Sequence, residues 1–257
     1  MNAAPAAPAA KAIGRSLRTY HAPSRAAVLD AFHRRFLDPG DLAFDVGAHV
    51  GDRAASFRRI GARVVCVEPQ PRLDRLLRLI FRGDPSVARV AALVGAAPAE
   101  AAVLRLNTAN PTVASASAGF IAAAEAGALG WEGQRWDAAI ARPVTTLDAL
   151  AAAHGRPHFV KLDVEGFEAE ALAGLSVPPR ALSFEFTTLQ RDVAFACLGR
   201  LRALGYRAFN ACLGEGMAFV RPAPCSGDAL AAWIAALPDE ANSGDAYASL
   251  EPARISG

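Results

Sequence analysis

Apolar residues along this chain occur in two patterns, short continuous runs and longer stretches with helical spacing. Continuous runs are typical of strands buried on both faces, and a spacing of three to four residues is typical of helices packed on one side. The first third of the sequence therefore predicts strands over 42–46, 62–67 and 87–94, and helices over 24–36, 52–59 and 72–81. Strands that alternate with helices form a parallel sheet with right-handed crossovers.

The same alternation returns in the second half of the chain. The patterns predict strands over 103–106, 142–145, 159–163 and 181–186, and helices over 146–153, 167–175 and 193–204. Two further apolar runs, 206–212 and 217–221, flank a glycine-containing turn and are interpreted as a closing antiparallel pair. The predicted fold class is therefore α/β, with a doubly wound and mostly parallel sheet.

Residues 107–136 interrupt the alternation. They are rich in Ala, Ser, Gly and Asn and show no clear period. A structureless loop of that length is uncommon in a compact domain unless it has a function, so we interpret it as an active-site cover with a short helix over 119–126. Trp131 and Trp136 either stack on an acceptor there or anchor the cover to the core.

The length of 257 residues suits one full-sized α/β core and is too short for two. We expect a single domain over 23–237. The Ala- and Pro-rich start and the last residues suggest flexible tails over 1–22 and 238–257.

Charge and composition exclude several classes of function. The net charge is +2 and no basic run stands out, so nucleic acid is not an expected partner. No apolar run is long enough to span a membrane, and the N-terminus does not resemble a secretory signal. The four cysteines fit no metal-binding spacing, and a reducing cytoplasm is the simplest compartment.

The most informative motif lies where the first predicted strand ends. Residues 44–51 read FDVGAHVG, and Glu68 ends the next strand. Glycines there let the backbone approach a ligand, and an acid about 20 residues later accepts hydrogen bonds from ribose hydroxyls. A dinucleotide favours Gly-x-Gly-x-x-Gly, but His49 replaces the second glycine. Asp45 suits a ligand with a cationic amino-acid end, which favours S-adenosylmethionine.

A second motif, KLDVEGFE, begins at Lys161. In a doubly wound sheet its strand lies beside the first, and its end faces the same crevice. Alternation places Lys161 and Asp163 on one face of the sheet, where a structural ion pair is one interpretation. The other is catalytic: Asp163 or Glu165 acts as general base for a hydroxyl, while Lys161 orients the acid or stabilises the developing alkoxide.

Glu185, at the end of the following strand, is a third acid at the same crevice. Asp163, Glu165 and Glu185 together are also a candidate ligand set for Mg²⁺, which would polarise the hydroxyl directly. The sequence leaves the base and the metal mechanisms open.

Four segments occur in order along the chain. They are DVGAHVG from Asp45 to Gly51, VEP around Glu68, TLD from Thr146, and the KLDVEGFE block. Together they closely resemble the FkbM family of S-adenosylmethionine-dependent methyltransferases over roughly residues 40–215. The resemblance implies the class I methyltransferase fold, with seven strands and an antiparallel last strand. It also implies O-methylation of a hydroxyl on a sugar or a polyketide-type natural product.

The resemblance further implies roles for individual residues. Asp45, Gly47 and Gly51 should line the methionine end of the cofactor, and Glu68 should hold the ribose. The remaining cofactor-binding candidates lie in the same loops or edge the adenine: Ala48, His49, Pro69, Ala91 and Ala92. The sequence departs from the family at His49, where asparagine is usual.

Two alternatives come from other classes. An NAD(P)-dependent oxidoreductase would need the missing second glycine, and the chain has no Tyr-x-x-x-Lys pair. A non-catalytic cofactor-binding protein of the same fold is disfavoured because Asp45 and Glu68 are both present. The expected partner is a small molecule with a hydroxyl, with no nucleic acid and no membrane, and the oligomeric state stays open.

Overall fold

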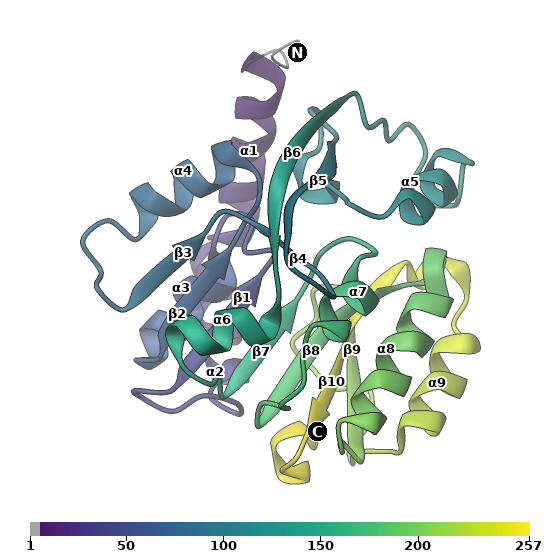
Figure 1. Cartoon of the computed structure of the whole chain (residues 1–257). Helices are drawn as coiled ribbons and strands as arrows, with labels where there is room; N and C mark the ends of the chain where they lie inside the picture. The colour runs from purple at the N-terminus through teal and green to yellow at the C-terminus, as the bar shows by residue number, and fades with distance from the viewer. Residues whose placement is uncertain (1–5) are drawn as a thin grey trace.

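The computed structural model describes residues 6–257, and a seven-stranded sheet with helices on both faces forms its centre (Figure 1). In order across the sheet, the strands are β3 (Val87–Val90), β2 (Arg63–Val67), β1 (Leu42–Val46), β7 (Phe159–Leu162), β8 (Ala181–Thr187), β10 (Ser243–Ser249) and β9 (Ala208–Leu213). Neighbours from β3 to β8 pair in parallel, and β10 is antiparallel to both β8 and β9. The predicted α/β class, the mostly parallel sheet and the antiparallel last strand are confirmed.

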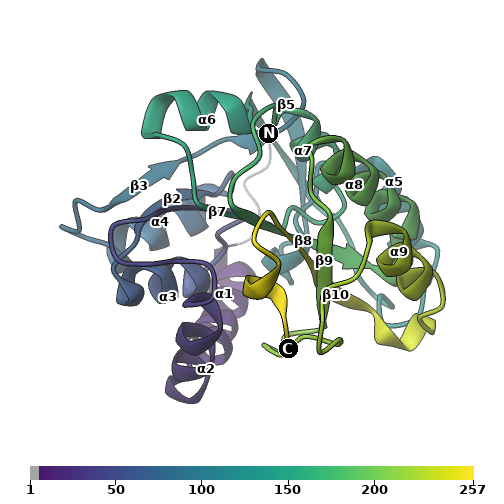
Figure 2. The same ribbon diagram turned by 90° about the horizontal axis from the view of Figure 1, so that it is seen from below.

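Alternating side chains along the strands build a separate core on each face. Phe44, Leu162 and Phe184 belong to one core, which is completed by α6 (Leu147–His154), α7 (Glu168–Ala173), α8 (Arg191–Ala203) and α9 (Gly227–Ala235). Ala43 and Phe159 belong to the other, beneath α2 (Pro23–His33), α3 (Asp52–Ile60) and α4 (Pro71–Ile80). Figure 2 shows α2 and α3 on one side and α8 and α9 on the other. Because alternation has a period of two, Asp45 and Lys161 lie on the α2–α4 face.

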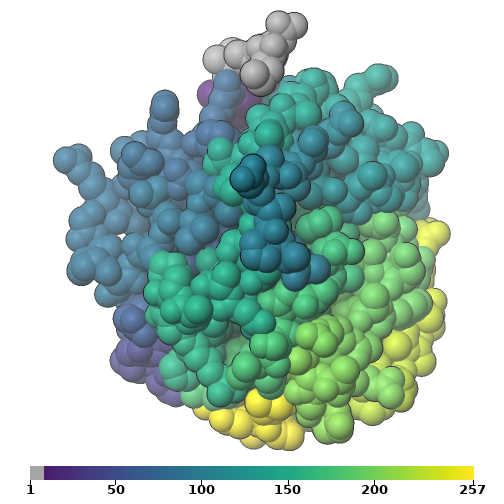
Figure 3. All heavy atoms as spheres, viewed as in Figure 1, coloured from purple at the N-terminus to yellow at the C-terminus, as the bar shows by residue number. Residues whose placement is uncertain are grey.

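The segments on either side of residues 107–136 form a small second sheet. Its strand order is β4 (Leu93–Val94), β6 (Ala138–Thr145) and β5 (Ala99–Leu106). The strand predicted over 87–94 is therefore two strands, because the chain leaves the main sheet after Val90. Between β5 and β6 lies the predicted cover, with the expected short helix as α5 (Ala118–Glu125). In the space-filling view the teal residues of this region lie across the upper part of the molecule (Figure 3).

The N-terminal expectation needs correction. Residues Ala6–Tyr20 of the predicted flexible segment 1–22 form helix α1, and residues 1–5 lie outside the described part of the chain. Alanine is the best helix former, so an Ala-rich segment takes this form once it has something to contact. The Arg15 guanidinium donates a hydrogen bond to the Ala109 carbonyl in the cover at 3.2 Å.

The C-terminal expectation is also wrong. Residues 238–257, expected as a flexible tail, contain β10, while residues 217–221 form no strand of the sheet. The sequence of β10, SGDAYAS, has no β-branched residue, so its pattern did not predict a strand. Small residues are needed there: a Cβ at Gly244 would lie 2.3 Å from the Cys212 carbonyl oxygen. The folded part extends beyond residues 23 and 237 at both ends.

Helix α9 was not predicted, because the apolar spacing over Gly227–Ala235 is dominated by alanine. Within residues 6–257, no helix combines the length and the apolar character that crossing a bilayer requires.

Candidate active site

A cavity of about 300 Å³ opens at the carboxyl ends of β1, β2, β7 and β8. Ligands bind at this edge of open α/β sheets, where the strand order reverses between β1 and β7. Residues from α1, from the cover and from the β9–β10 connection complete its wall. The cavity thus joins segments that are far apart in the sequence.

The turn after β1 is fixed by a glycine that touches the end of β7. Gly47 has φ +80°, and a Cβ there would lie 1.7 Å from the Asp163 carbonyl oxygen. Only glycine fits this close approach. Gly51, also at positive φ, is the residue before α3 and has no room for a side chain beside Leu77. It does not line the cavity, which corrects the expectation that it would.

Asp45 lies at the floor of the cavity and is 1% exposed. Its Oδ2 accepts a hydrogen bond from the Ala54 backbone N–H at 3.0 Å, while Oδ1 is buried and has no partner among the residues that the structure describes. Burial raises the pKa of this carboxyl to about 6. A donor brought by a ligand would satisfy the unpaired oxygen.

Glu68 ends β2 with both carboxylate oxygens held by the backbone. Oε2 accepts from the His49 N–H at 2.9 Å, and Oε1 accepts from the Gln70 N–H at 2.8 Å. Burial raises the Glu68 pKa to about 8. Each oxygen keeps a lone pair that can accept from a ligand hydroxyl.

The other predicted cofactor residues gather around the same cavity. Ala48, His49, Pro69 and Ala92 all line it, together with Asp45, Gly47 and Glu68. His49 adopts φ +47°, its ring packs edge-on against Tyr20, and its buried Nε2 has no partner. Burial lowers the His49 pKa, which favours the neutral ring.

Lys161 lies deep in the site, on the strand position beside Asp45. It is 6% exposed, and its ammonium donates to Asp163 Oδ2. Burial opposes its charge, but the carboxylates of Asp163, Asp245 and Asp45 together raise the Lys161 pKa above its usual value. The predicted sharing of one face by Lys161 and Asp163 agrees with this contact.

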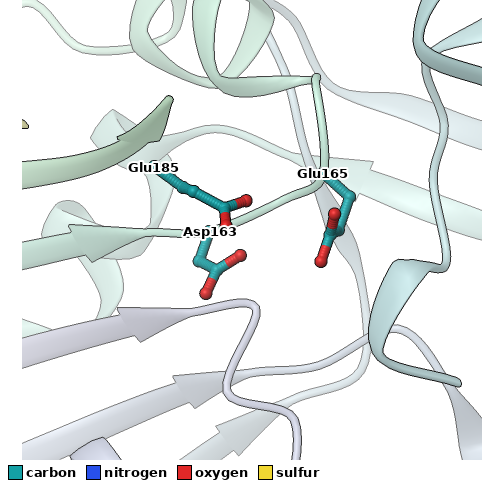
Figure 4. Close-up of side chains that lie close together, drawn as sticks. All are labelled: Asp163, Glu165 and Glu185. Atoms are coloured by element: carbon teal, nitrogen blue, oxygen red, sulfur yellow. The ribbon is translucent and has the colours of Figure 1, made fainter. Parts of the chain in front are cut away.

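Three carboxylates converge beside this ion pair. One ligand atom each from Asp163, Glu165 and Glu185 lies within 4.8 Å of the others, and Figure 4 shows the three side chains around a common space. Burial, followed by repulsion from Asp163, raises the pKa of Glu165 and of Glu185 well above the usual value. The three residues that the sequence offered as bases or metal ligands are thus brought together.

Glu168, from the same motif, has a different environment. Its Oε1 accepts a hydrogen bond from the Val164 N–H at 2.8 Å, just before α7, and it does not line the cavity. This contact is a structural one that shapes the loop after β7.

Sequence reasoning missed a charged network in the wall of the cavity. Arg53 is 7% exposed and donates to Asp52 at 2.6 Å and to Glu215 at 2.7 Å. Against the effect of burial, Arg53 and then Arg25 lower the Glu215 pKa to about 2. With Tyr20 of α1, this network closes one end of the cavity. Arginine is so abundant in this chain that Arg53 did not stand out as a candidate. Glu215 lies between two glycines, and that pattern predicted only a turn.

The two tryptophans of the cover differ. Trp136 donates to the Val113 carbonyl at 2.8 Å, packs edge-on against Phe120 and does not line the cavity, so it anchors the cover. Trp131 lines the cavity and donates to Asn242 Oδ1 at 3.0 Å.

Comparisons with solved structures find distant similarity. A TehB-like SAM-dependent methyltransferase from Corynebacterium glutamicum is 10% identical, with a TM-score of 0.47, and covers 93% of this chain and 98% of its own. A SAM-dependent O-methyltransferase from Thermotoga maritima is 10% identical, with a TM-score of 0.43, and the match covers 89% of this chain and 66% of that one. Fibrillarin from Aeropyrum pernix, with natively bound S-adenosyl-L-methionine, is 11% identical, with a TM-score of 0.44, and the match covers 82% of this chain and 67% of that one. No curated protein sequence matches the chain.

A sequence model described as the methyltransferase FkbM domain matches residues 45–208. The match begins at Asp45, includes both motifs and spans more than half of the chain. The chain therefore belongs to the FkbM family and is an S-adenosylmethionine-dependent methyltransferase.

Proposed function

We propose that this methyltransferase transfers the methyl group to a hydroxyl of a small molecule in the cytoplasm. The observation that carries the proposal is the cluster of Asp163, Glu165 and Glu185 beside the Lys161 ammonium, facing the cavity. A hydroxyl must lose its proton during methylation, and this cluster offers a place for that proton.

The cavity has the features that S-adenosylmethionine needs. The unpaired Asp45 Oδ1 suits the cationic amino-acid end, and the Glu68 carboxylate suits the two ribose hydroxyls. Gly47 lets the turn that follows Asp45 pack directly against the Asp163 carbonyl. When bound, S-adenosylmethionine supplies an electrophilic methyl carbon on a positively charged sulfur.

Asp163 is the carboxylate best placed to accept the hydroxyl proton. Burial and the neighbouring acids raise the pKa values of Glu165 and Glu185, which disfavours their charged forms, whereas Lys161 forms an ion pair with Asp163. The acceptor oxygen bonds to the methyl carbon as the carbon–sulfur bond breaks. The sulfur keeps that electron pair, and the hydroxyl proton passes to Asp163. Enclosure of the cavity favours this alignment and limits competing water.

The charges of the cavity support a neutral or cationic acceptor. Its wall carries two cations, Arg53 and Lys161, and both are already paired with carboxylates. The acids on the wall are more numerous: Asp45, Asp52, Glu68, Asp163, Glu165, Glu185 and Glu215. Such a site repels phosphate, which argues against a nucleic-acid acceptor.

The test combines the purified chain and S-adenosylmethionine with a panel of neutral hydroxylated compounds, glycosides and polyketides among them. Mass spectrometry identifies the methylated atom. We expect an O-methyl product, and turnover lost in Asp163→Asn, while Glu170→Gln, on the exposed surface of α7, keeps it. Methylation on carbon or nitrogen, or full activity of Asp163→Asn, would contradict the proposal.

Each alternative predicts a different result in the same assay. A non-catalytic protein would bind S-adenosylhomocysteine tightly and methylate no member of the panel. The oxidoreductase alternative is disfavoured by the family match and by His49 in the glycine turn.

A further inference from the structure

Two of the three clustered carboxylates lack the protein donors that buried acids usually have. Glu165 is 8% exposed, and within residues 6–257 its only hydrogen bond is the one its backbone carbonyl accepts from the Ser115 hydroxyl at 2.6 Å. The Oε2 atom of Glu185 is also buried, and none of the described residues supplies a hydrogen-bond partner for it. Buried carboxylates are normally paired or bind a cation, so these two side chains indicate a missing partner.

Glu168 gives the contrast within the same loop. Its carboxylate accepts from the Val164 N–H, so the fold supplies a donor to the acid that does not face the cavity. The carboxylates that face the cavity, those of Glu165 and Glu185, accept no hydrogen bond from any residue of the described part of the chain. Figure 4 shows both directed toward the space beside Asp163.

The placement of Glu165 is costly. It adopts φ +55°, and the following Gly166 packs so closely that a Cβ there would lie 2.7 Å from Phe120. The fold thus holds the Glu165 carboxylate in the cluster.

The spacing of the oxygens matches a hard divalent cation. Ca²⁺ binds oxygen at about 2.3–2.6 Å and Mg²⁺ at about 2.0–2.1 Å, so opposite ligands lie about 5 Å and about 4 Å apart. Ligand atoms within 4.8 Å of one another therefore fit Ca²⁺ directly, and fit Mg²⁺ after a small inward shift. All three ligands are carboxylate oxygens, which these ions prefer over nitrogen or sulfur.

We propose that Asp163, Glu165 and Glu185 bind one hard divalent cation, Mg²⁺ or a related ion. The proposal rests on the proposed function, since the cation would bind the acceptor oxygen where methyl transfer occurs. Bound there, it favours loss of the hydroxyl proton and fixes the position of the oxygen.

The Lys161 ammonium does not replace this cation. It contacts Asp163 Oδ2, and no ion pair joins it to Glu165 or Glu185 among residues 6–257. The positive sulfur of the methyl donor also suits an acid-rich cavity, so the total charge alone does not locate a second cation. The convergence of three carboxylates is what indicates the position of the second cation.

The experiment measures Mn²⁺ binding to the full chain, without methyl donor, from the loss of the free-ion electron paramagnetic resonance signal. We expect one Mn²⁺ per chain, displaced by Mg²⁺. Asp163→Asn and Glu185→Gln should each weaken binding at least about tenfold. Glu170→Gln, an exposed acid on the neighbouring helix, should change it less than about twofold. S-adenosylhomocysteine binding by each variant shows that it has folded.

Two results would overturn the proposal: wild-type binding no stronger than that of the Asp163→Asn/Glu185→Gln double variant, or Mn²⁺ that Mg²⁺ cannot displace. The same samples separate this proposal from the proposed function. S-adenosylhomocysteine binding without Mn²⁺ binding refutes the cation site alone, whereas Mn²⁺ binding by a chain that methylates carbon or nitrogen instead of oxygen refutes only the proposed function.

Discussion

Lys161 shows how one side chain joins the two motifs. It is one of two lysines among 27 basic residues, its ammonium is paired with Asp163, and Asp245 and Asp45 also raise its pKa. A lysine places a compact charge on a thin stem, whereas arginine carries a wide planar fork. Because Lys161 is 6% exposed, an arginine there would place this wider group among buried side chains.

We therefore expect Lys161→Arg to lower kcat at least about tenfold, because it displaces the Asp163 carboxylate. S-adenosylhomocysteine affinity should change much less. The measurement is steady-state kinetics beside calorimetric titration of the same preparation. An enzyme that keeps its kcat would make Lys161 a structural residue.

Glu68 should make ligand binding depend on pH. Burial raises its pKa to about 8 in the free protein, and ribose hydroxyls that donate to the carboxylate would favour its charged form. Binding near pH 7 should then release a proton, and affinity should rise up to about pH 8 and level off above. Asp45, with a pKa of about 6, is already charged in this range.

Stability of the free protein should change with pH in the opposite direction. A carboxyl whose folded pKa exceeds its ordinary value of 4.5 stabilises the fold at low pH, and that contribution is lost as the pH rises through about 8. The proton release on ligand binding is measured by titration calorimetry in two buffers of different ionisation enthalpy. Glu68→Gln should remove it, and proton release that persists in this variant would exclude Glu68 as its source.

The sequence led to several residues that line the cavity because each belongs to a local motif with a backbone reason. Gly47, Asp45 and Glu68 lie at strand ends, where the fold class alone determines their surroundings. Arg53 and Glu215 were missed because their contact joins residues 162 positions apart. No local pattern reports such a pair.

At the scale of elements, the turn between β1 and α3 depends on Gly47. A side chain there would collide with the Asp163 carbonyl at 1.7 Å, so Gly47→Ala must separate β1 from β7 or distort the turn. We expect a loss of more than about 1 kcal/mol in stability, with weaker S-adenosylhomocysteine binding.

Gly199 provides the matched control. It lies in α8, and a Cβ added to it would meet nothing within 4 Å, so Gly199→Ala should stabilise the chain by about 0.5–1 kcal/mol. Chemical denaturation compares the two variants. Equal stability of Gly47→Ala and the wild type would show that the turn tolerates a side chain.

The elements predicted best were those with strong apolar runs, β1, β2, β7 and β8. Those predicted worst, β10 and α9, are rich in alanine, glycine and serine. Their conformation is set by neighbours: β10 pairs with β8 and β9 on both sides. Tertiary contacts overrode the weak local propensity of these segments, and the local sequence pattern does not indicate such contacts.

At the scale of the whole molecule, the cavity links the sheet edge to the cover and to α1. A ligand that fills it should therefore protect segments far from β1 in sequence. We expect S-adenosylhomocysteine to slow hydrogen exchange in residues 46–54, 66–70 and 112–116, and to leave α9 unchanged. Exchange followed by mass spectrometry tests this, and protection centred on α8 and α9 would place the ligand elsewhere.

The central claim is that this cavity binds S-adenosylmethionine through Asp45 and Glu68, and its most direct test is a calorimetric titration with S-adenosylhomocysteine and, separately, NAD⁺. We predict one S-adenosylhomocysteine per chain, at least about tenfold weaker binding in Glu68→Ala, and no heat from NAD⁺. Binding of NAD⁺ in preference to S-adenosylhomocysteine, or S-adenosylhomocysteine binding unaffected by Glu68→Ala, would contradict the account.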